Sequence, residues 1–189
     1  MRRLVYAFIL FTFYFLSFNA IAHGSVGTGS TEENQERTIV FPDTKQFKTV
    51  ITDLHTHSVF SDGHVWPNIR VSEALRDGVD ALAITEHLEY QPWSDDIPHP
   101  DRNRSYIVAS QSAEGKNKNL EKKLIIINGQ EITRSMPPGH INAIFIDDAN
   151  KLLHIDDSLK GIKEANKQNA FLFWNHPAWP AQRSDGIAR

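Results

Sequence analysis

The stretch Thr49-Val50-Ile51-Thr52-Asp53-Leu54-His55-Thr56-His57 decides the fold that this sequence predicts. Its first half is rich in β-branched residues, which is typical of a buried strand. Side chains two residues apart in a strand point the same way, so Asp53, His55 and His57 share one face. Two imidazoles on one face are placed to bind one metal ion, and Asp53 is placed to orient them.

Strands and helices alternate after this stretch. We expect further strands at 81–85, 124–128, 141–146 and 170–174. We expect helices at 67–77, 102–123 and 158–169, the second of them interrupted near Gly115. Residues 91–101 contain three prolines and predict a long loop. The alternation is typical of βα units with parallel strands, so the predicted fold class is α/β.

Histidines and acidic residues lie next to the ends of these predicted strands. In parallel βα folds, the C-terminal strand ends open onto one mouth, where active sites form. We therefore expect these side chains to converge, with Asp53 and Glu131 in catalytic roles. The predicted metal ligands are His55, His57, Asp62, His87, Glu131, His140 and His176.

Several of these residues have a structural alternative. Asp62 in Ser61-Asp62-Gly63 is also typical of a turn. Glu86 can be read as an exposed acid at a strand end, which makes His87 the better ligand candidate. For Glu131 the alternative to a bridging carboxylate is a helix cap or a loop salt bridge. The remaining histidines lack the placement and are interpreted as surface or supporting positions, namely His64, His99 and His154.

The candidate ligands are all imidazoles or carboxylates, and the chain contains no cysteine. This donor set suits Zn²⁺, Mn²⁺ or Fe²⁺. Six or more ligands exceed the needs of one tetrahedral ion, so two or three divalent metal ions are expected. Such a cluster suits phosphate ester hydrolysis. The net charge of −3 predicts no general attraction to nucleic acid.

The N-terminus predicts export. Arg2 and Arg3 precede an apolar run over 4–18, and Ala20 and Ala22 supply the small residues of a cleavage site. Residues 1–22 therefore read as a signal peptide, which predicts a secreted, periplasmic protein without a membrane anchor. An uncleaved anchor helix is the alternative, but the run is shorter than the roughly 20 residues of a bilayer span. Residues 23–47 read as a flexible arm, and the domain occupies 48–189.

Four motifs together carry a family resemblance. Asp53-Leu54-His55-Thr56-His57-Ser58, Ser61-Asp62-Gly63, Thr85-Glu86-His87 and Asn175-His176-Pro177 resemble the PHP (polymerase and histidinol phosphatase) superfamily. The chain is more narrowly similar to the secreted Sb-PDE family of phosphodiesterases, in the stretches Pro137-Pro138-Gly139-His140-Ile141-Asn142 and Phe173-Trp174-Asn175-His176-Pro177.

The resemblance implies a distorted (β/α)₇ barrel with a di- or trinuclear metal site. By this likeness His55 and His57 bind the first metal and Glu131 bridges to a second, which His140 and His176 complete. Asp62 and His87 serve a third. The family's late Asp-x-His motif is not found in this sequence, so we expect only the N-terminal strands of the barrel and a C-terminally incomplete domain.

The predicted function is that of a metal-dependent phosphoesterase, and by the narrower resemblance a phosphodiesterase, acting through a metal-bound hydroxide on a small-molecule ester. The alternatives are a phosphomonoesterase, a metal-dependent amidohydrolase and a non-catalytic periplasmic metal-binding protein. For phosphate recognition the candidates are Arg102, Arg104 and Arg134, all with surface roles as the alternative. For an apolar pocket they are Trp93, Trp174 and Trp179, with core packing as the alternative for Trp174.

Overall fold

The computed structural model describes residues 40–154 and 157–180. The predicted signal peptide (1–22) and residues 23–39 of the predicted arm lie outside this part. Residues 40–47 are exposed and contain no helix or strand. Within the described ranges, no helix combines the length and the apolar character that crossing a bilayer requires.

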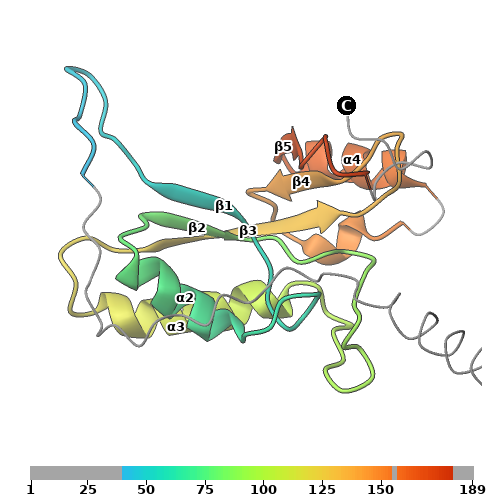
Figure 1. Cartoon of the computed structure of the whole chain (residues 1–189), viewed down its shortest axis with the longest axis horizontal. Coiled ribbons are helices and arrows are strands. Elements are labelled where there is room, and N and C mark those ends of the chain that lie inside the picture. The colour runs from blue at the N-terminus through green and yellow to red at the C-terminus, as the bar shows by residue number, and fades with distance from the viewer. Residues whose placement is uncertain (1–39, 155–156, 181–189) are drawn as a thin grey trace, which may run out of the picture. The chain divides into compact units, whose positions relative to one another are not determined.

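Five strands of the described chain form one curled sheet in the order β1-β2-β3-β4-β5 (Figure 1). The strands β1 (Thr52–Thr56), β2 (Ala81–Ile84) and β3 (Ile125–Ile132) run parallel. The strand β4 (Ile141–Ile144) is antiparallel to β3, and β5 (Phe171–Trp174) is antiparallel to β4. This mixed α/β half-barrel agrees with part of the expected barrel.

The expectation of an all-parallel sheet is wrong at β4. A parallel crossover needs about a dozen residues or more, whereas only residues 133–140 connect β3 to β4, so the chain turns back as a hairpin. The same pairing explains why β3 extends beyond the predicted 124–128. Its last part, Gly129–Ile132, lies opposite β4, with Gly129 facing Ile144 and Ile132 facing Ile141.

Two helices cover one face of the parallel strands (Figure 1). The helix α2 (Pro67–Arg76) begins at a proline, whose missing N–H costs nothing at a helix start, and Gly78 follows its end with φ of 74°. The helix α3 (Arg104–Asn117) runs through Gly115, so the predicted interruption there is wrong. A single glycine weakens a helix by about 1 kcal/mol and does not by itself end it.

The chain between β4 and β5 forms a 3₁₀ turn and a further helix. The turn η1 (Ala149–Leu152) is capped by Asp148, whose carboxylate accepts a hydrogen bond from the backbone of Asn150. The helix α4 (Ser158–Lys167) is capped by Asp157, which accepts from the backbone N–H groups of Leu159 and Lys160. Each cap satisfies donors that the first helical turn leaves free.

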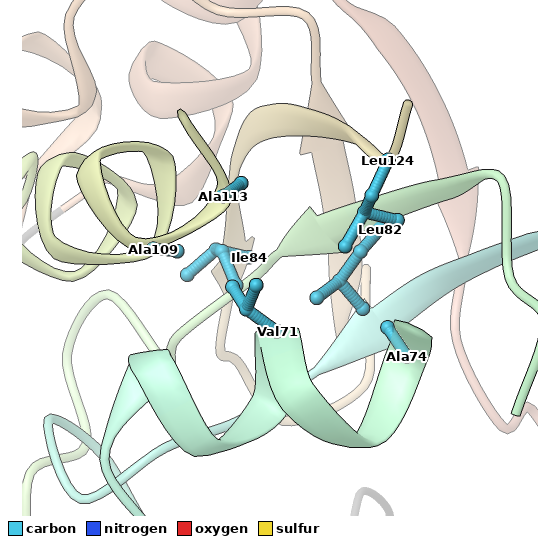
Figure 2. Close-up of a cluster of buried hydrophobic side chains, with 7 residues drawn as sticks. All are labelled: Val71, Ala74, Leu82, Ile84, Ala109, Ala113 and Leu124. Carbon is cyan, nitrogen blue, oxygen red and sulfur yellow. The ribbon is translucent and has the colours of Figure 1, made fainter. Parts of the chain in front are cut away.

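Buried side chains fix the sheet from both faces. On the helix side, α2 and α3 pack on β2 through a cluster drawn in Figure 2: Val71, Ala74, Leu82, Ile84, Ala109, Ala113 and Leu124. On the other face Ala81 and Ala83 of β2 pack against Ile127 and Ile144. Burying one large aliphatic side chain contributes roughly 1.5–3 kcal/mol. The strand β2 is thus held on both sides, and the side chains that follow it are held in place.

Candidate metal centre

The ends of all five strands bring the predicted ligands to one edge of the sheet. His57 follows β1, His87 follows β2 and His176 follows β5. His140 precedes β4, and because β4 is antiparallel to β3, its start lies where β3 ends. A parallel β4 would have placed His140 at the opposite edge, so the hairpin is what brings this residue into the site.

Glu131 lies at the centre of the site. It does not follow β3, as the sequence predicted, but lies within it, opposite Asn142 of β4. Its side chain is completely buried (0% exposed). The carboxylate oxygens of Glu131 lie 2.6–3.6 Å from ring nitrogens of five histidines: His140 at 2.6 Å, His55 at 2.8 Å, His57 at 3.2 Å, and His87 and His176 at 3.6 Å.

Asp62 extends the site on the side of His57 and His87. Its carboxylate lies 3.4 Å from Nε2 of His87 and 3.8 Å from Nδ1 of His57. The rings of His57 and His87 are stacked, with their centroids 4.5 Å apart. Asp62 is more exposed than Glu131, so it forms the outer wall of the centre.

Three groups of side chains are spaced closely enough to hold a metal ion, with one donor atom of each residue within 4.8 Å of the others. The groups are His55, Glu131 and His176; His57, Asp62 and His87; and His87, Glu131 and His140. All donors are imidazole nitrogens or carboxylate oxygens, and Nε2 of His55 and Nε2 of His57 face each other at 3.0 Å. Convergent nitrogens beside a buried carboxylate fit divalent cations of the zinc, manganese or iron type.

The electrostatics of the site follow from this packing. Burial raises the pKa of Glu131, but hydrogen bonds from His140, His55 and His57 outweigh burial and hold the pKa well below its usual range. Burial lowers the pKa of His57, but Glu131 and then Asp62 outweigh it, so the net pKa is raised. The pKa of His176 is lowered, chiefly by burial.

The carboxylate of Asp62 is held ionised in the same way. Burial raises its pKa, and the hydrogen bond and charge of His87, followed by the charge of His57, lower it by more. The negative charges of Glu131 and Asp62 are therefore balanced by the surrounding imidazoles. A bound cation can balance the same charges in their place.

Asp53 belongs to none of these three groups. It is exposed, and its carboxylate accepts a hydrogen bond from the backbone N–H of His55 at 3.2 Å. The structure therefore does not show Asp53 bonded to an imidazole, and its predicted role in orienting the histidines stays a prediction.

Glu86 is the residue that sequence reasoning missed. The interpretation as an exposed acid is wrong, because Glu86 is completely buried and hydrogen-bonded to Ser58 and Ser61. Ser61 in turn contacts His57. The available signal was position: Glu86 comes two residues after the end of β2, a strand that is buried on both faces, where an exposed side chain is not expected.

The other histidines and the arginines have structural contacts. His99 is buried (2% exposed) against the ring of Phe60, so it is not a surface residue. Arg102 donates to the carbonyl of Leu88, Arg104 to the carbonyl of Pro98, and Arg134 to the carbonyl of His154 while it pairs with Glu89. The guanidinium groups of these three arginines therefore bond to other groups of the chain.

Two exposed aromatic rings flank the site. The ring of Trp179 packs edge-on against His140 and His176, at centroid distances of 5.4 and 5.0 Å. Tyr90 lies edge-on to His87 at 5.7 Å. Trp93 contacts His64 and donates to the carbonyl of Gly63. The expectation that Trp174 packs in the core is wrong, because this residue is 48% exposed.

Comparison with solved structures identifies a similar protein of known fold. A two-domain protein from Bacteroides vulgatus, which contains a predicted PHP-like metal-dependent phosphoesterase, is 48% identical, with a TM-score of 0.71. The match covers 78% of this chain and 41% of that one, so this chain spans less than half of that protein's length.

A second solved structure is more distant. It is a protein inferred to be a metal-dependent phosphoesterase from Bifidobacterium adolescentis, 23% identical over 63% of this chain and 33% of its own, with a TM-score of 0.41. No family model matches the sequence, and a search of curated proteins finds no match.

Proposed function

The chain belongs to the PHP superfamily, and on that premise we propose that it is a metal-dependent phosphoesterase that cleaves phosphodiesters of small molecules. The observation that carries the proposal is Glu131, a buried carboxylate with imidazole nitrogens of five histidines within 3.6 Å. A carboxylate in a structural ion pair rarely has five histidine partners. A carboxylate that bridges metal ions has several, because the histidines around it are the other ligands of those ions.

The chain's own residues would hold two or three ions. Glu131 would bridge them, since its two oxygens face different histidines: His55 and His57 on Oε2, His140 and His176 on Oε1. Asp62 and His87 would hold an ion at the outer wall. Divalent ions in such a site lower the pKa of water and neutralise charge on phosphate oxygens.

The flanking aromatic rings support an organic ester as substrate. Trp179 and Tyr90 each present an exposed ring beside the ligands, where the alcohol groups of an ester would lie. Apolar rings of this kind favour a substrate with organic groups on phosphorus, which a diester carries twice and a monoester once.

Hydrolysis of bis(4-nitrophenyl) phosphate by the full-length protein tests the proposal. We expect turnover with Mn²⁺ or Zn²⁺, loss of turnover with a chelator, and faster cleavage of the diester than of 4-nitrophenyl phosphate. Glu131→Gln and His57→Ala should each remove most of the turnover. Arg76→Gln is the control variant, since Arg76 pairs with the neighbouring Asp77 at the end of α2 and belongs to none of the three ligand groups.

The other outcomes separate the alternatives. Faster cleavage of the monoester would identify a phosphomonoesterase. Hydrolysis of amides or lactones without phosphoester cleavage would identify an amidohydrolase. Metal binding without any hydrolysis would identify a metal-binding protein. Equal rates with and without chelator would reject the metal-dependent mechanism.

We also propose that the protein is exported and that residues 1–22 are removed. The support is the sequence pattern alone, since these residues lie outside the described part. N-terminal sequencing of the protein from a periplasmic extract should begin at His23. A protein that retains Met1 in the membrane fraction would contradict cleavage.

A further inference from the structure

A buried carboxylate lies behind His57 and belongs to none of the three ligand groups. Glu86 accepts the backbone N–H of Ser58 at 3.1 and 3.0 Å, the hydroxyl of Ser58, and the hydroxyl of Ser61 at 2.5 Å. All of these partners are able to donate. A buried charge is costly unless such bonds compensate it, and the bonds from Ser58 and Ser61 do so here. These bonds leave open what Glu86 contributes to the neighbouring site.

The single hydrogen of the Ser61 hydroxyl determines what this arrangement does. The oxygen of Ser61 lies 2.5 Å from Oε2 of Glu86 and 3.3 Å from Nδ1 of His57. A carboxylate has no hydrogen to donate, so Ser61 donates to Glu86. The hydroxyl then has only lone pairs to offer His57, and the contact between them requires Nδ1 of His57 to carry the hydrogen.

In the protonated ring both nitrogens carry a hydrogen, and Nε2 donates to Glu131. In the neutral ring the hydrogen on Nδ1, next to Ser61, is the one retained, so the other nitrogen carries the lone pair. This nitrogen, Nε2, faces the centre of the site, 3.2 Å from Oε2 of Glu131 and 3.0 Å from Nε2 of His55. The backbone at His57 is fixed independently, because Arg70 of α2 donates to its carbonyl at 2.9 Å. The backbone of His57 and the hydrogen position on its ring are thus set by separate contacts.

We propose that Glu86 and Ser61 are positioning residues for the metal centre. Glu86 takes the hydrogen of Ser61, and Ser61 fixes His57 as the Nδ1–H tautomer with its Nε2 lone pair directed at the ions. The proposal rests on the proposed function only for its consequence, a higher metal affinity. The tautomer itself is a property of the protein without metal.

His87 provides an internal reference. The hydroxyl of Thr133 lies 2.6 Å from Nδ1 of His87 and donates to the backbone carbonyl of Glu131 at 3.2 Å. His87 has its own hydroxyl partner, so changes at Ser61 or Glu86 leave that partner in place. The two histidines are read in the same spectrum, and a general loss of structure would alter both.

The test is ¹⁵N NMR of the histidine rings in the metal-free full-length protein, at an alkaline pH where the same spectra show the imidazoles to be neutral. In the wild type we expect His57 as Nδ1–H. Ser61→Ala should populate both tautomers of His57. Glu86→Gln should shift His57 toward the Nε2–H tautomer, since an amide has one acceptor fewer and no longer holds the hydrogen of Ser61 as firmly. Ser61→Thr keeps the hydroxyl and should keep the tautomer. Ser58→Ala, the matched control, removes a donor to Glu86 that does not touch His57.

Metal affinity completes the test. Ser61→Ala should weaken Zn²⁺ binding by about 10–100-fold in a competition titration, and Ser61→Thr should restore it. A wild-type His57 in the Nε2–H form, or a tautomer unchanged in Ser61→Ala and Glu86→Gln, would overturn the proposal. Unchanged Zn²⁺ affinity in Ser61→Ala would also overturn it. Absence of phosphoester hydrolysis in the wild type would reject the proposed function and leave the tautomer result standing.

Discussion

At Glu131 a buried negative charge is balanced by imidazoles and not by lysine or arginine. Histidine can stop balancing the carboxylate when a metal ion arrives, because its neutral ring binds the ion. Lysine and arginine would hold the carboxylate permanently and exclude a cation. The choice of partners around this one residue is therefore what distinguishes a metal centre from a structural ion pair.

His99 predicts a pH-dependent stability that is separate from the metal centre. Burial, followed by the charge of Arg102, lowers its pKa to about 4, and no described residue accepts a hydrogen bond from its Nε2. The unfolded chain binds a proton near pH 6.5, so folding loses stability as the pH falls from about 6.5 toward 4. Between pH 7 and pH 5 we expect a loss of about 2 kcal/mol from this residue, measured by urea unfolding.

His99→Phe is the control for this prediction. It keeps a ring against Phe60 and removes the titration. The variant should lose about 2 kcal/mol less than the wild type between the two pH values. An equal loss in both proteins would show that His99 is protonated as easily in the folded state.

Trp179 predicts substrate selectivity. Because its ring lies exposed beside His140 and His176, we expect it to contact an aromatic ester group. Trp179→Ala should raise KM for bis(4-nitrophenyl) phosphate by about 3–10-fold relative to methyl 4-nitrophenyl phosphate. Trp179→Phe should retain most of the preference. A KM ratio unchanged in Trp179→Ala would remove this residue from the substrate site.

At the scale of the elements, the sequence predicted the strands and helices better than their directions. The β-branched runs and the Pro67 and Gly78 signals of α2 depend on neighbouring residues, and the structure confirms them. The direction of β4 depends on how the chain returns after β3, which strand periodicity does not contain. The short connection 133–140 was the one local signal of a hairpin.

Two glycines predict opposite effects. A Cβ on Gly63 would lie 2.6 Å from the carbonyl oxygen of His57, in the turn that carries Asp62. Gly63→Ala should therefore destabilise the protein by about 1–3 kcal/mol in urea unfolding and weaken metal binding. Gly115 in α3 faces open space, so Gly115→Ala should stabilise by about 0.5–1 kcal/mol. Equal effects would contradict the close packing of the turn on His57.

At the scale of the whole molecule, spacing and residue type predicted which side chains converge but not what supports them. The strand-end rule selected His55, His87 and His176 because parallel strands end at a common edge. The support of His57 by Glu86 depends on a turn that returns over 58–63. Burial of that turn arises from tertiary packing, so the sequence alone made Glu86 look like a surface acid.

Metal binding should couple to folding of the whole domain. Ions held by residues from all parts of the sheet bind the folded state only, so they stabilise it. At a metal concentration about 100-fold above Kd, we expect Tm to rise by on the order of 5–10 °C. Glu131→Gln should abolish most of the rise. An equal rise in that variant would place the stabilising ion elsewhere.

The most direct measurement is the anomalous scattering of Mn²⁺ in crystals of the full-length protein. We predict at least two peaks, one on each side of the Glu131 carboxylate. Each should lie about 2.0–2.3 Å from a carboxylate oxygen or an imidazole nitrogen of the site. Peaks absent from Glu131, or found only on other surfaces, would contradict the metal centre and with it the proposed hydrolase.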